Sequence, residues 1–298
     1  MYKQIDFNKR RTALLLALFL IFIIGLGWIF GYLFDAVWIL PAAVIFAIFQ
    51  ALVSYYYSDQ ITLAVSGARE VPRKEPYLRL HRIVENLAIA AGLPKPKVCV
   101  IHDPAPNAFA TGRDPQHSAI AVTTGLLEKL DKPELEGVIS HEMSHIGNYD
   151  IRLMTIVVVL VGVVALISDW FLRWSFWGGG RRDREGGQIG AILVLVGIVL
   201  AILAPIAAWL IQLAISRKRE FLADATGALM TRYPEGLALA LEKISQDPHR
   251  LQRATRATAH LYIAEPLKKQ NLDGGSSLFA THPPIRERIR LLRGMIGS

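Results

Sequence analysis

The stretch VISHEMSHIGNYDIRLMTIVVVLVGVVALIS, residues 138–168, joins a metal-ligand spacing to a long apolar run on one segment. His141 and His145 are four residues apart, so both rings project from one face of a helix and can bind one ion. Glu142 lies one step around the same helix, beside the two rings. From Leu153 onward, 16 residues carry no charge. The segment predicts a metal-binding helix that runs directly into a membrane span.

The rest of the chain also favours a membrane protein, since hydrophobic residues make up 52% of its 298 residues. Uncharged runs of 23 residues lie between Arg11 and Asp35 and between Asp35 and Asp59. Each can cross a hydrocarbon layer of about 30 Å at about 1.5 Å per residue. Further uncharged runs occupy residues 153–168 and 186–216. We therefore predict a mainly α-helical, multi-pass membrane protein with four transmembrane helices, the first of which is a retained anchor.

The basic residues predict the orientation of the chain. Four of them precede the first run (Lys3, Lys9, Arg10 and Arg11), whereas the turn around Asp35 carries none. The positive-inside rule places the N-terminus and the polar segments in the cytoplasm. The loop after the third run conflicts with this rule, because it would lie outside yet carries three arginines (Arg181, Arg182 and Arg184).

Four segments follow from this pattern. Residues 1–57 form an N-terminal transmembrane hairpin, and residues 153–216 form a second one. Residues 58–152 and 217–298 are two polar parts of one domain, the first containing the His141 helix. Within residues 58–152 the pattern predicts an amphipathic helix ending at Gly92 and short strands at 95–103 and 118–125. A turn is predicted at 112–116, between residues 107–111 and the second of these strands. A helix then begins with Asp131 as its N-cap.

The composition excludes other classes. The net charge of +8 comes from basic residues that are scattered or that flank the apolar runs, and no nucleic-acid recognition motif is present. The predicted partners are therefore the lipid bilayer and protein substrates, with no nucleic acid. The single cysteine, Cys99, forbids an internal disulfide. No charged residue interrupts an apolar run, which argues against a transporter.

A third metal ligand is needed, and SRKREFLADATGALM, residues 216–230, offers one. Glu220 and Asp224 are four apart, so they share a helix face. Glu220 is the candidate third ligand, and Asp224 could hydrogen-bond a ligand histidine. The alternative is an ordinary charged face on a helix that leaves the membrane. Two apolar runs separate His141 from Glu220, so both ends lie on the same side of the bilayer.

Two histidines and one carboxylate favour zinc, which in a catalytic site keeps one position for water. Glu142 would then take the proton of that water as general base. The sequence therefore predicts one Zn²⁺ per chain and a hydrolase. The alternative, a helix with two solvated histidines, is disfavoured by how rarely HExxH occurs by chance. Five other histidines lack ligand spacing and are predicted to be surface or structural residues (His81, His102, His117, His249 and His260).

Four motifs in order, NAFATG, HEMSH, SRKREFLADATGA and THPPIRERI, together resemble the HtpX-type membrane metallopeptidases, gluzincins related to the CAAX prenyl proteases. The resemblance implies an α+β, zincin-like catalytic domain with a small sheet. It implies zinc ligands at His141, His145 and Glu220 and a catalytic base at Glu142. It also implies a cytoplasm-facing zinc endopeptidase of the inner or plasma membrane that degrades misfolded or damaged membrane proteins.

The resemblance implies two further sets of residues. Asn107, Ala108, Phe109 and Ala110 lead into an edge strand along which substrate lies extended. The alternative is a loop-to-strand junction with Phe109 in the core. His282 and a downstream arginine would steady the oxyanion; Arg286, Arg288 and Arg290 compete for that role, and Arg288 is preferred. Alternatively, His282 caps a turn.

Rival classes remain open at this point. An intramembrane site-2-type protease also uses HExxH, with a third ligand from an LDG segment such as NLDGG at residues 271–275. However, both motifs here lie in polar sequence. The prenyl-protein proteases share the zinc constellation but have more spans. A catalytically silent zinc scaffold would bind zinc through four protein ligands, mostly Cys and His. Substrate identity, cleavage preference, regulation and oligomeric state do not follow from the sequence.

Overall fold

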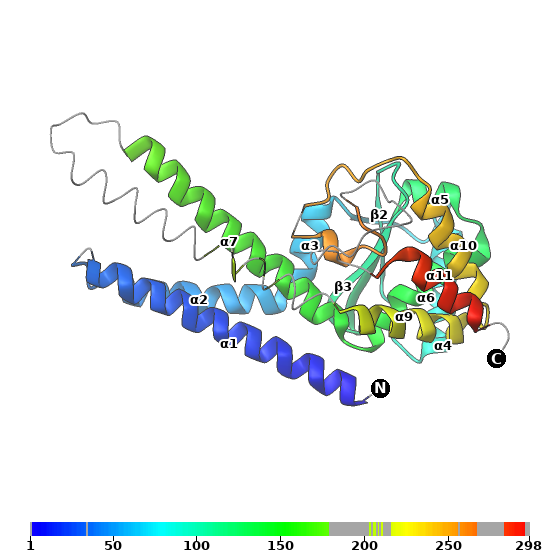
Figure 1. The fold of residues 1–298 in the computed structure, drawn as a ribbon, viewed down its shortest axis with the longest axis horizontal. Coiled ribbons are helices and arrows are strands. Elements are labelled where there is room, and N and C mark those ends of the chain that lie inside the picture. Colours follow the sequence, from blue (N-terminus) through cyan, green and yellow to red (C-terminus); the bar gives the residue numbers. More distant parts are fainter. Residues whose placement is uncertain are drawn as a thin grey trace.

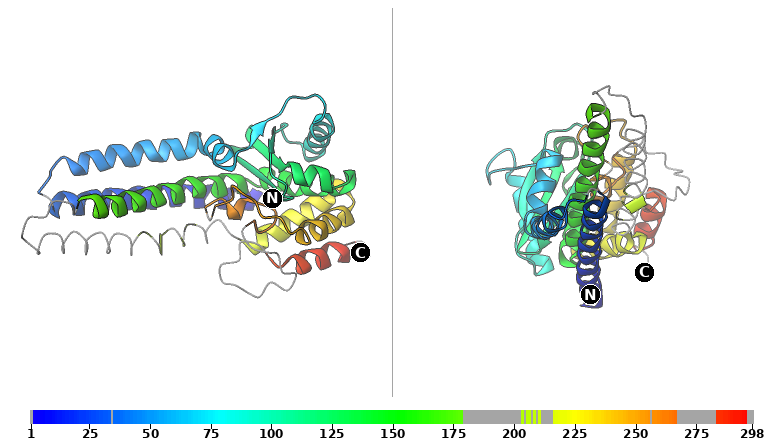
Figure 2. Two further views of the ribbon diagram at one scale, coloured as in Figure 1. Left: turned by 90° about the horizontal axis from the view of Figure 1, so that it is seen from above. Right: turned by 90° about the vertical axis from the view of Figure 1, so that its left-hand side faces the viewer.

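Three long helices extend together from one side of a more compact part (Figure 1). The computed structural model describes residues 2–33, 35–178, 216–255, 257–266 and 283–295, with five single positions between 203 and 210. The long helices are α1 (Tyr2–Leu33), α2 (Ile39–Tyr56) and α7 (Asp150–Gly178). Viewed from above, all three run alongside one another, and α1 and α7 overlap along their length (Figure 2).

These helices are the candidate membrane spans. Among the described residues, three segments are long and apolar enough to cross a bilayer: Ile5–Tyr32, Ile39–Tyr56 and Asp150–Asp169. The hairpin of α1 and α2 exposes large apolar side chains that water would not favour, such as Ile21, Trp28 and Ile45. The predicted fourth span, residues 186–216, lies outside the described residues apart from scattered positions. The structure thus supports three of the four predicted spans.

The third span is longer than its uncharged run. The run of 16 residues begins at Leu153, but α7 begins at Asp150 and its candidate span covers 20 residues. Arg152 marks the polar end of this span, where its guanidinium lies 5.6 Å from the centre of the Tyr55 ring and donates a hydrogen bond to the carbonyl of Arg113. The arginine is thus satisfied by a protein carbonyl and an aromatic ring at the helix end.

The compact part is built on a mixed, four-stranded sheet. Its strands are β1 (Arg69–Glu70), β2 (Lys97–Ile101), β3 (Ala108–Asp114) and β4 (His117–Thr123), in the order β1-β2-β4-β3. Strands β2 and β4 pair in parallel, while the outer strands are antiparallel to their neighbours. The two predicted strands are confirmed as β2 and β4. The turn is shorter than predicted, because β3 continues through Asp114.

Both faces of the sheet are buried, because alternate strand residues enter two different cores. One core includes Val98, Val100, Ala108, Ala110, Ile120 and Val122. The other, which also contains residues of α1 and α7, includes Cys99, Ile101, Phe109, Ala119 and Ala121. The sheet therefore connects the membrane helices on one side to the remaining helices on the other. Phe109 is fully buried, as the core alternative required.

The remaining elements are helices. Those N-terminal to α7 are α3 (Ser58–Ser66), α4 (Leu78–Ala91), α5 (Thr124–Lys129) and α6 (Lys132–Gly147). Those after it are α9 (Arg217–Thr231), α10 (Pro234–Ser245), the 3-10 turn η1 (Ala259–Leu261) and α11 (Ile285–Gly294). The predicted stop of α4 is confirmed, since Gly92 adopts the left-handed conformation at its C-cap.

Helix α6 begins as the sequence predicts. Asp131 and Glu134 form a reciprocal capping box, in which each side chain accepts a hydrogen bond from the other residue's backbone N–H. Pro133 lies in the first turn, where its missing N–H needs no partner. Glu134 is also bonded to Lys243 of α10 at 2.7 Å, which ties the start of α6 to its neighbour.

Two glycines let other helices approach α6 closely. A Cβ on Gly227 of α9 would lie 3.0 Å from the backbone nitrogen of His141, and one on Gly137 would lie 2.6 Å from the nitrogen of Leu237 in α10. Helix α6 is therefore held between α9 and α10 at distances that larger residues would not allow. This packing brings the 216–230 segment against the two histidines.

Helix α6 does not run straight into the membrane span, contrary to the prediction from the sequence. It ends at Gly147, and Tyr149 adopts a left-handed conformation with φ of 60° before α7 begins at Asp150. A left-handed non-glycine residue is unfavourable unless its surroundings hold it. Here the ring of Tyr149 lies beneath Lys9 of α1, at 4.8 Å, and beside Arg152. The break separates α6 from α7 and places Asp150 beside His145.

Candidate metal centre and active site

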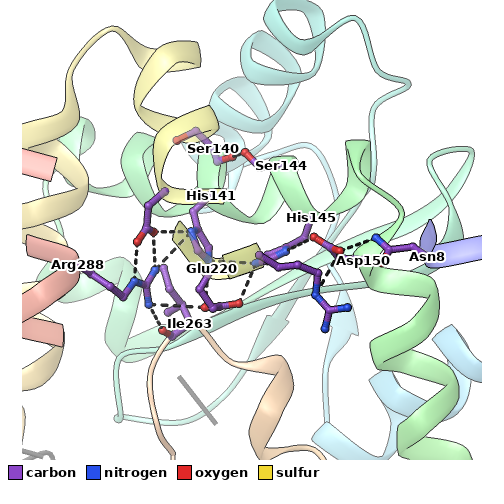
Figure 3. Close-up of polar contacts among 11 residues, drawn as sticks. Asn8, Ser140, His141, Ser144, His145, Asp150, Glu220, Ile263 and Arg288 are labelled. Atoms are coloured by element: carbon purple, nitrogen blue, oxygen red, sulfur yellow. Dashed lines mark hydrogen bonds and ion pairs between the residues drawn. The ribbon is translucent and has the colours of Figure 1, made fainter. Parts of the chain in front are cut away.

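His141, His145 and Glu220 converge on one point (Figure 3). The Nε2 atoms of the two histidines are 3.2 Å apart, and Glu220 Oε1 lies 3.5 Å from His145 Nε2. Glu220 Oε2 is 3.9 Å from His141 Nε2. All three side chains are buried. Helices α6 and α9, separated by some 70 residues of chain, supply the three donors.

The donor set fits a zinc ion. Ligand atoms at about 2.0–2.2 Å from zinc and in tetrahedral arrangement lie about 3.3 Å from one another. Two of the separations, 3.2 and 3.5 Å, are close to that value, and the third, 3.9 Å, is longer. Three protein ligands of this kind are typical of catalytic sites, whereas structural sites have four, mostly Cys and His.

Each histidine is oriented by a carboxylate behind it. His141 Nδ1 lies 2.8 Å from Asp224 Oδ1, and His145 Nδ1 lies 3.0 Å from Asp150 Oδ2. Because an ionised carboxylate only accepts, each Nδ1 donates its proton, and each Nε2 is the nitrogen that is left to bind an ion. Arg288 Nη2 also lies 3.4 Å from His141 Nδ1, but both groups are donors, so Asp224 is the partner that decides the tautomer.

Arg288 is fixed by a buried ion pair. Its Nε and Nη2 donate to the two carboxylate oxygens of Asp224, at 2.8 and 2.7 Å, and its Nη1 donates to the carbonyl of Ile263 at 2.8 Å. Glu220 Oε2 lies 3.9 Å from Nη1. Of the three competing arginines, Arg288 is the one at this site, and its side chain is fully buried. These contacts indicate that Arg288 orients the carboxylates of Asp224 and Glu220.

Glu142 is almost fully buried, and its carboxyl interacts with the charges of His145 and Glu220. Burial raises the pKa of its carboxyl to about 7, and the charge of Glu220 adds to that rise. The charge of His145 and a backbone hydrogen bond from Ala110 act in the other direction. Within the described part of the chain, its Oε1 atom has no hydrogen-bond partner. A buried acceptor with this pKa beside a metal-ligand trio is suited to take up a proton.

The two histidines have opposite pKa shifts. Burial lowers the pKa of His141 to about 4, with the charge of Arg288 adding to the effect of burial. Burial also disfavours the charged form of His145, but its hydrogen bond to Asp150 and the charge of Glu220 raise its pKa to about 9. Burial by itself would raise the pKa of Asp224, but the charge of Arg288 and the hydrogen bonds from Arg288 and His141 lower it to about 2. Asp224 is therefore ionised and ready to orient His141.

The segment Asn107–Ala110 enters β3 at the outer edge of the sheet. The Asn107 side chain exchanges hydrogen bonds with the backbone of Ala264, and the N–H of Ile263 donates to the carbonyl of Ala108 at 2.9 Å. Phe109 packs against Tyr262, with ring centroids 5.2 Å apart. Residues 262–264 therefore cover the start of this edge.

The far end of the same edge is covered by α7. The Gly112 N–H donates to Thr155 Oγ1 at 3.4 Å. Between these two covered positions lies Ala110, whose backbone faces Glu142. Ala110 is thus the one residue of this edge between the two covered positions, and its backbone contacts the Glu142 carboxyl.

Sequence reasoning missed two residues at the site. Asp150, the partner of His145, lies where the polar sequence meets the third apolar run. An acidic residue at this boundary could have been singled out as a candidate site residue. Asn8 of α1 contacts Asp150 from 142 residues away, and nothing in its local sequence indicated this. The predicted His282 lies outside the described residues. Buried His81 and His260 bond to backbone carbonyls, as structural histidines do.

A buried His-His-Glu trio, a neighbouring carboxylate and apolar helices of membrane-spanning length define a membrane metallopeptidase. A sequence model of peptidase family M48 matches residues 74–296. The chain belongs to peptidase family M48, and it is a membrane metalloprotease. Metalloproteases of this family are zinc-dependent in general.

Relatives match almost the whole chain. A protein named Protease HtpX homolog from Caldanaerobacter subterraneus subsp. tengcongensis is 47% identical, over 97% of this chain and 95% of the relative. One with the same name from Dictyoglomus turgidum is 46% identical over 99% and 94%, and one from Tropheryma whipplei strain Twist is 48% identical over 99% and 98%. Among solved structures, S. mikatae Ste24p is similar at a TM-score of 0.48 and 21% identity, covering 84% of this chain and 57% of that one.

Proposed function

We propose that the chain is a zinc endopeptidase in which His141, His145 and Glu220 bind one zinc ion and Glu142 is the general base. The observation that carries this proposal is the unpartnered, buried Oε1 of Glu142 among the described residues, beside three converging ligand atoms. Residues 58–152 and 217–298 supply different ligands, so we propose that both belong to one catalytic domain. The transmembrane segments at 1–57 and 153–216 anchor it.

Zinc in this position would polarise the scissile carbonyl and make a water molecule easier to ionise. Glu142 takes the proton from that water at Oε1 and later donates it to the leaving amine. Its pKa of about 7 suits both steps, because the group exchanges a proton readily near neutral pH. Burial of the site excludes bulk water and strengthens these interactions.

Asp224 and Asp150 hold the two histidines in one tautomer, with both Nε2 atoms toward the ion. Arg288 acts through Asp224, since it binds both oxygens of that carboxylate. We also propose that His282 steadies the oxyanion. This role is supported by the resemblance of the THPPIRERI segment to the HtpX-type metallopeptidases.

The substrate main chain would pair with β3 at Ala110, where the strand edge faces Glu142. Asn107, Ala108 and Phe109 shape the approach to this position. A substrate must therefore present an extended, locally unfolded segment. Since α6 joins the end of a membrane-spanning helix, the site lies close to the bilayer, which suits unfolded or damaged membrane proteins as substrates.

The cytoplasm-facing orientation rests on the basic residues that precede α1. An intramembrane site is disfavoured, because α6 is not among the candidate spans of the described residues. A silent scaffold would not need the buried carboxylate of Glu142 next to the ligands.

Reconstitution into sealed vesicles tests substrate class and orientation together. An unfolded test protein is offered outside the vesicles, and an N-terminal tag reports which side the N-terminus occupies. We expect cleavage only by molecules whose tag is outside, and faster cleavage of unfolded than of folded test protein. Cleavage by molecules with the tag inside would contradict the placement of the active site on the same side as the N-terminus. Equal cleavage of the unfolded and the folded test protein would contradict the proposed substrate class.

A further inference from the structure

Asn8 of the first membrane helix reaches the metal centre. Its side chain is fully buried, and its Nδ2 donates to Asp150 Oδ1 at 2.7 Å and to the carbonyl of Asn148 at 3.0 Å. Asp150 Oδ2, the other oxygen of that carboxylate, lies 3.0 Å from Nδ1 of the candidate ligand His145. A continuous line of polar contacts therefore runs from α1 through Asp150 to His145 (Figure 3).

Both acceptors of Asn8 belong to the junction between the metal-binding helix and the third membrane span. The Asn148 carbonyl lies just beyond the last turn of α6, where carbonyls lack partners within the helix. Asp150 begins α7. Between them stands Tyr149 in its left-handed conformation, and the neighbouring Lys9 lies over its ring. Two successive residues of α1 thus hold the one turn that places Asp150 behind His145.

We propose that Asn8 is a positioning residue of the metal centre, which fixes the Asp150 carboxylate so that His145 is held toward the ion. The first membrane helix is then part of the metal site as well as an anchor. Residue 8 lies outside residues 74–296, the part matched by the family model. The proposal rests on the proposed function in one respect, namely that His145 is a zinc ligand.

The chemistry of the contact requires a side chain that donates two hydrogen bonds. Both partners are oxygen acceptors, so the side chain must offer N–H groups, which fixes the orientation of the Asn8 amide. A leucine of similar volume would fill the space but leave the Asp150 oxygen without its closest donor. Arg219 Nε lies 3.5 Å from the same oxygen, so part of the support for Asp150 would remain. Loss of Asn8 should therefore weaken the site less than loss of Asp150.

The test is zinc affinity of the full-length, detergent-purified protein, measured by competition with a chromophoric chelator. Wild type, Asn8→Leu, Asp150→Ala and the double variant are compared, with Glu220→Ala as the ligand control. We expect Asp150→Ala to weaken zinc binding about 10- to 100-fold and Asn8→Leu about 5- to 10-fold, in line with the effect of outer partners of metal ligands. We expect the double variant to bind no more weakly than Asp150→Ala, because Asn8 acts through Asp150.

Thr12→Val is the matched control on the same helix, because the Thr12 hydroxyl donates to the Asn8 carbonyl within α1 and Thr12 is also buried. Its zinc affinity should equal that of wild type. If Asn8→Leu prevents folding, Asn8→Ala gives the same comparison. Cobalt in place of zinc adds a spectroscopic check, since a displaced His145 changes the visible absorption bands.

Zinc affinity of Asn8→Leu equal to wild type would overturn the proposal. So would a loss that adds in full to that of Asp150→Ala, because Asn8 would then act elsewhere. Failure of the wild type itself to bind zinc, or full binding by Glu220→Ala, would instead contradict the proposed function. The two failures are therefore distinguishable.

Discussion

Glu220 of α9 lies 3.5 Å from His145 of α6, with its Oε1 facing the histidine Nε2. The two residues are separated in sequence by a membrane-spanning helix and the residues after it. The polar segment before α7 and the one that begins at residue 216 thus meet in one site. This contact makes the position of α9 against α6 critical for the metal centre.

Replacing Glu220 with alanine should abolish stable zinc binding. The two histidines would remain, but two ligands bind zinc much more weakly than three. The loss should exceed the about 10- to 100-fold typical for an outer partner of a ligand. Metal analysis of the purified variant checks this, with Glu287→Ala, at a half-buried position in the first turn of α11, as a control. Full zinc occupancy in Glu220→Ala would show that the third ligand is misassigned.

Zinc affinity should rise with pH. In the metal-free protein the pKa of His145 is raised to about 9, so the ring holds a proton at neutral pH that must leave before it can bind zinc. Each proton released makes the apparent affinity rise about 10-fold per pH unit below that pKa. Chelator competition from about pH 6 to about pH 8 measures the slope. Asp150→Asn removes a charge that raises this pKa and should flatten the slope; a pH-independent affinity in the wild type would contradict the assignment.

Removing one partner of the buried Asp224–Arg288 ion pair should destabilise the protein. Arg288→Met leaves the Asp224 carboxylate buried without its partner, and the expected loss of stability is about 3–5 kcal/mol. Adding Asp224→Asn removes that charge and should recover part of the loss. Unfolding of the solubilised protein by denaturant gives both values. Losses that simply add would show that the two side chains are not coupled.

Gly227 should be intolerant of a side chain. A Cβ there would lie 3.0 Å from both the His141 nitrogen and Ser140 Oγ, so Gly227→Ala pushes α9, and with it Glu220, away from α6. The expected destabilisation is about 1–3 kcal/mol, together with weaker zinc binding.

Gly162 of α7 provides a matched control, because a Cβ there has no described atom within 4 Å. Gly162→Ala should leave both the stability and the zinc affinity of the site unchanged or slightly improved, since alanine favours a helix. Equal effects of the two substitutions on zinc binding would contradict the role of close α6–α9 packing.

Much of the site could be predicted from the sequence, because helical periodicity is local. The four-residue spacings of His141 and His145 and of Glu220 and Asp224 define faces of single helices. The Asp131 capping box is equally local. These patterns indicated the ligands, and the structure brings them together.

Other features depend on contacts between distant parts of the chain. The break at Tyr149 was missed because a left-handed tyrosine has no local signature, and tertiary contacts hold it. Asn8 was missed for the same reason, since its acceptors are about 140 residues away. Arg288 was selected among three arginines, but its bidentate bond to Asp224 could not be read from sequence.

The most direct test of the account is Glu142→Gln in the full-length, zinc-loaded protein. The substitution keeps the volume and the metal ligands but removes the group that accepts the proton. We expect full zinc content with a fall of about 10²- to 10⁴-fold in cleavage of an unfolded test protein, the usual share of a general base. Cleavage at the wild-type rate by a Glu142→Gln protein that retains its zinc would contradict the account.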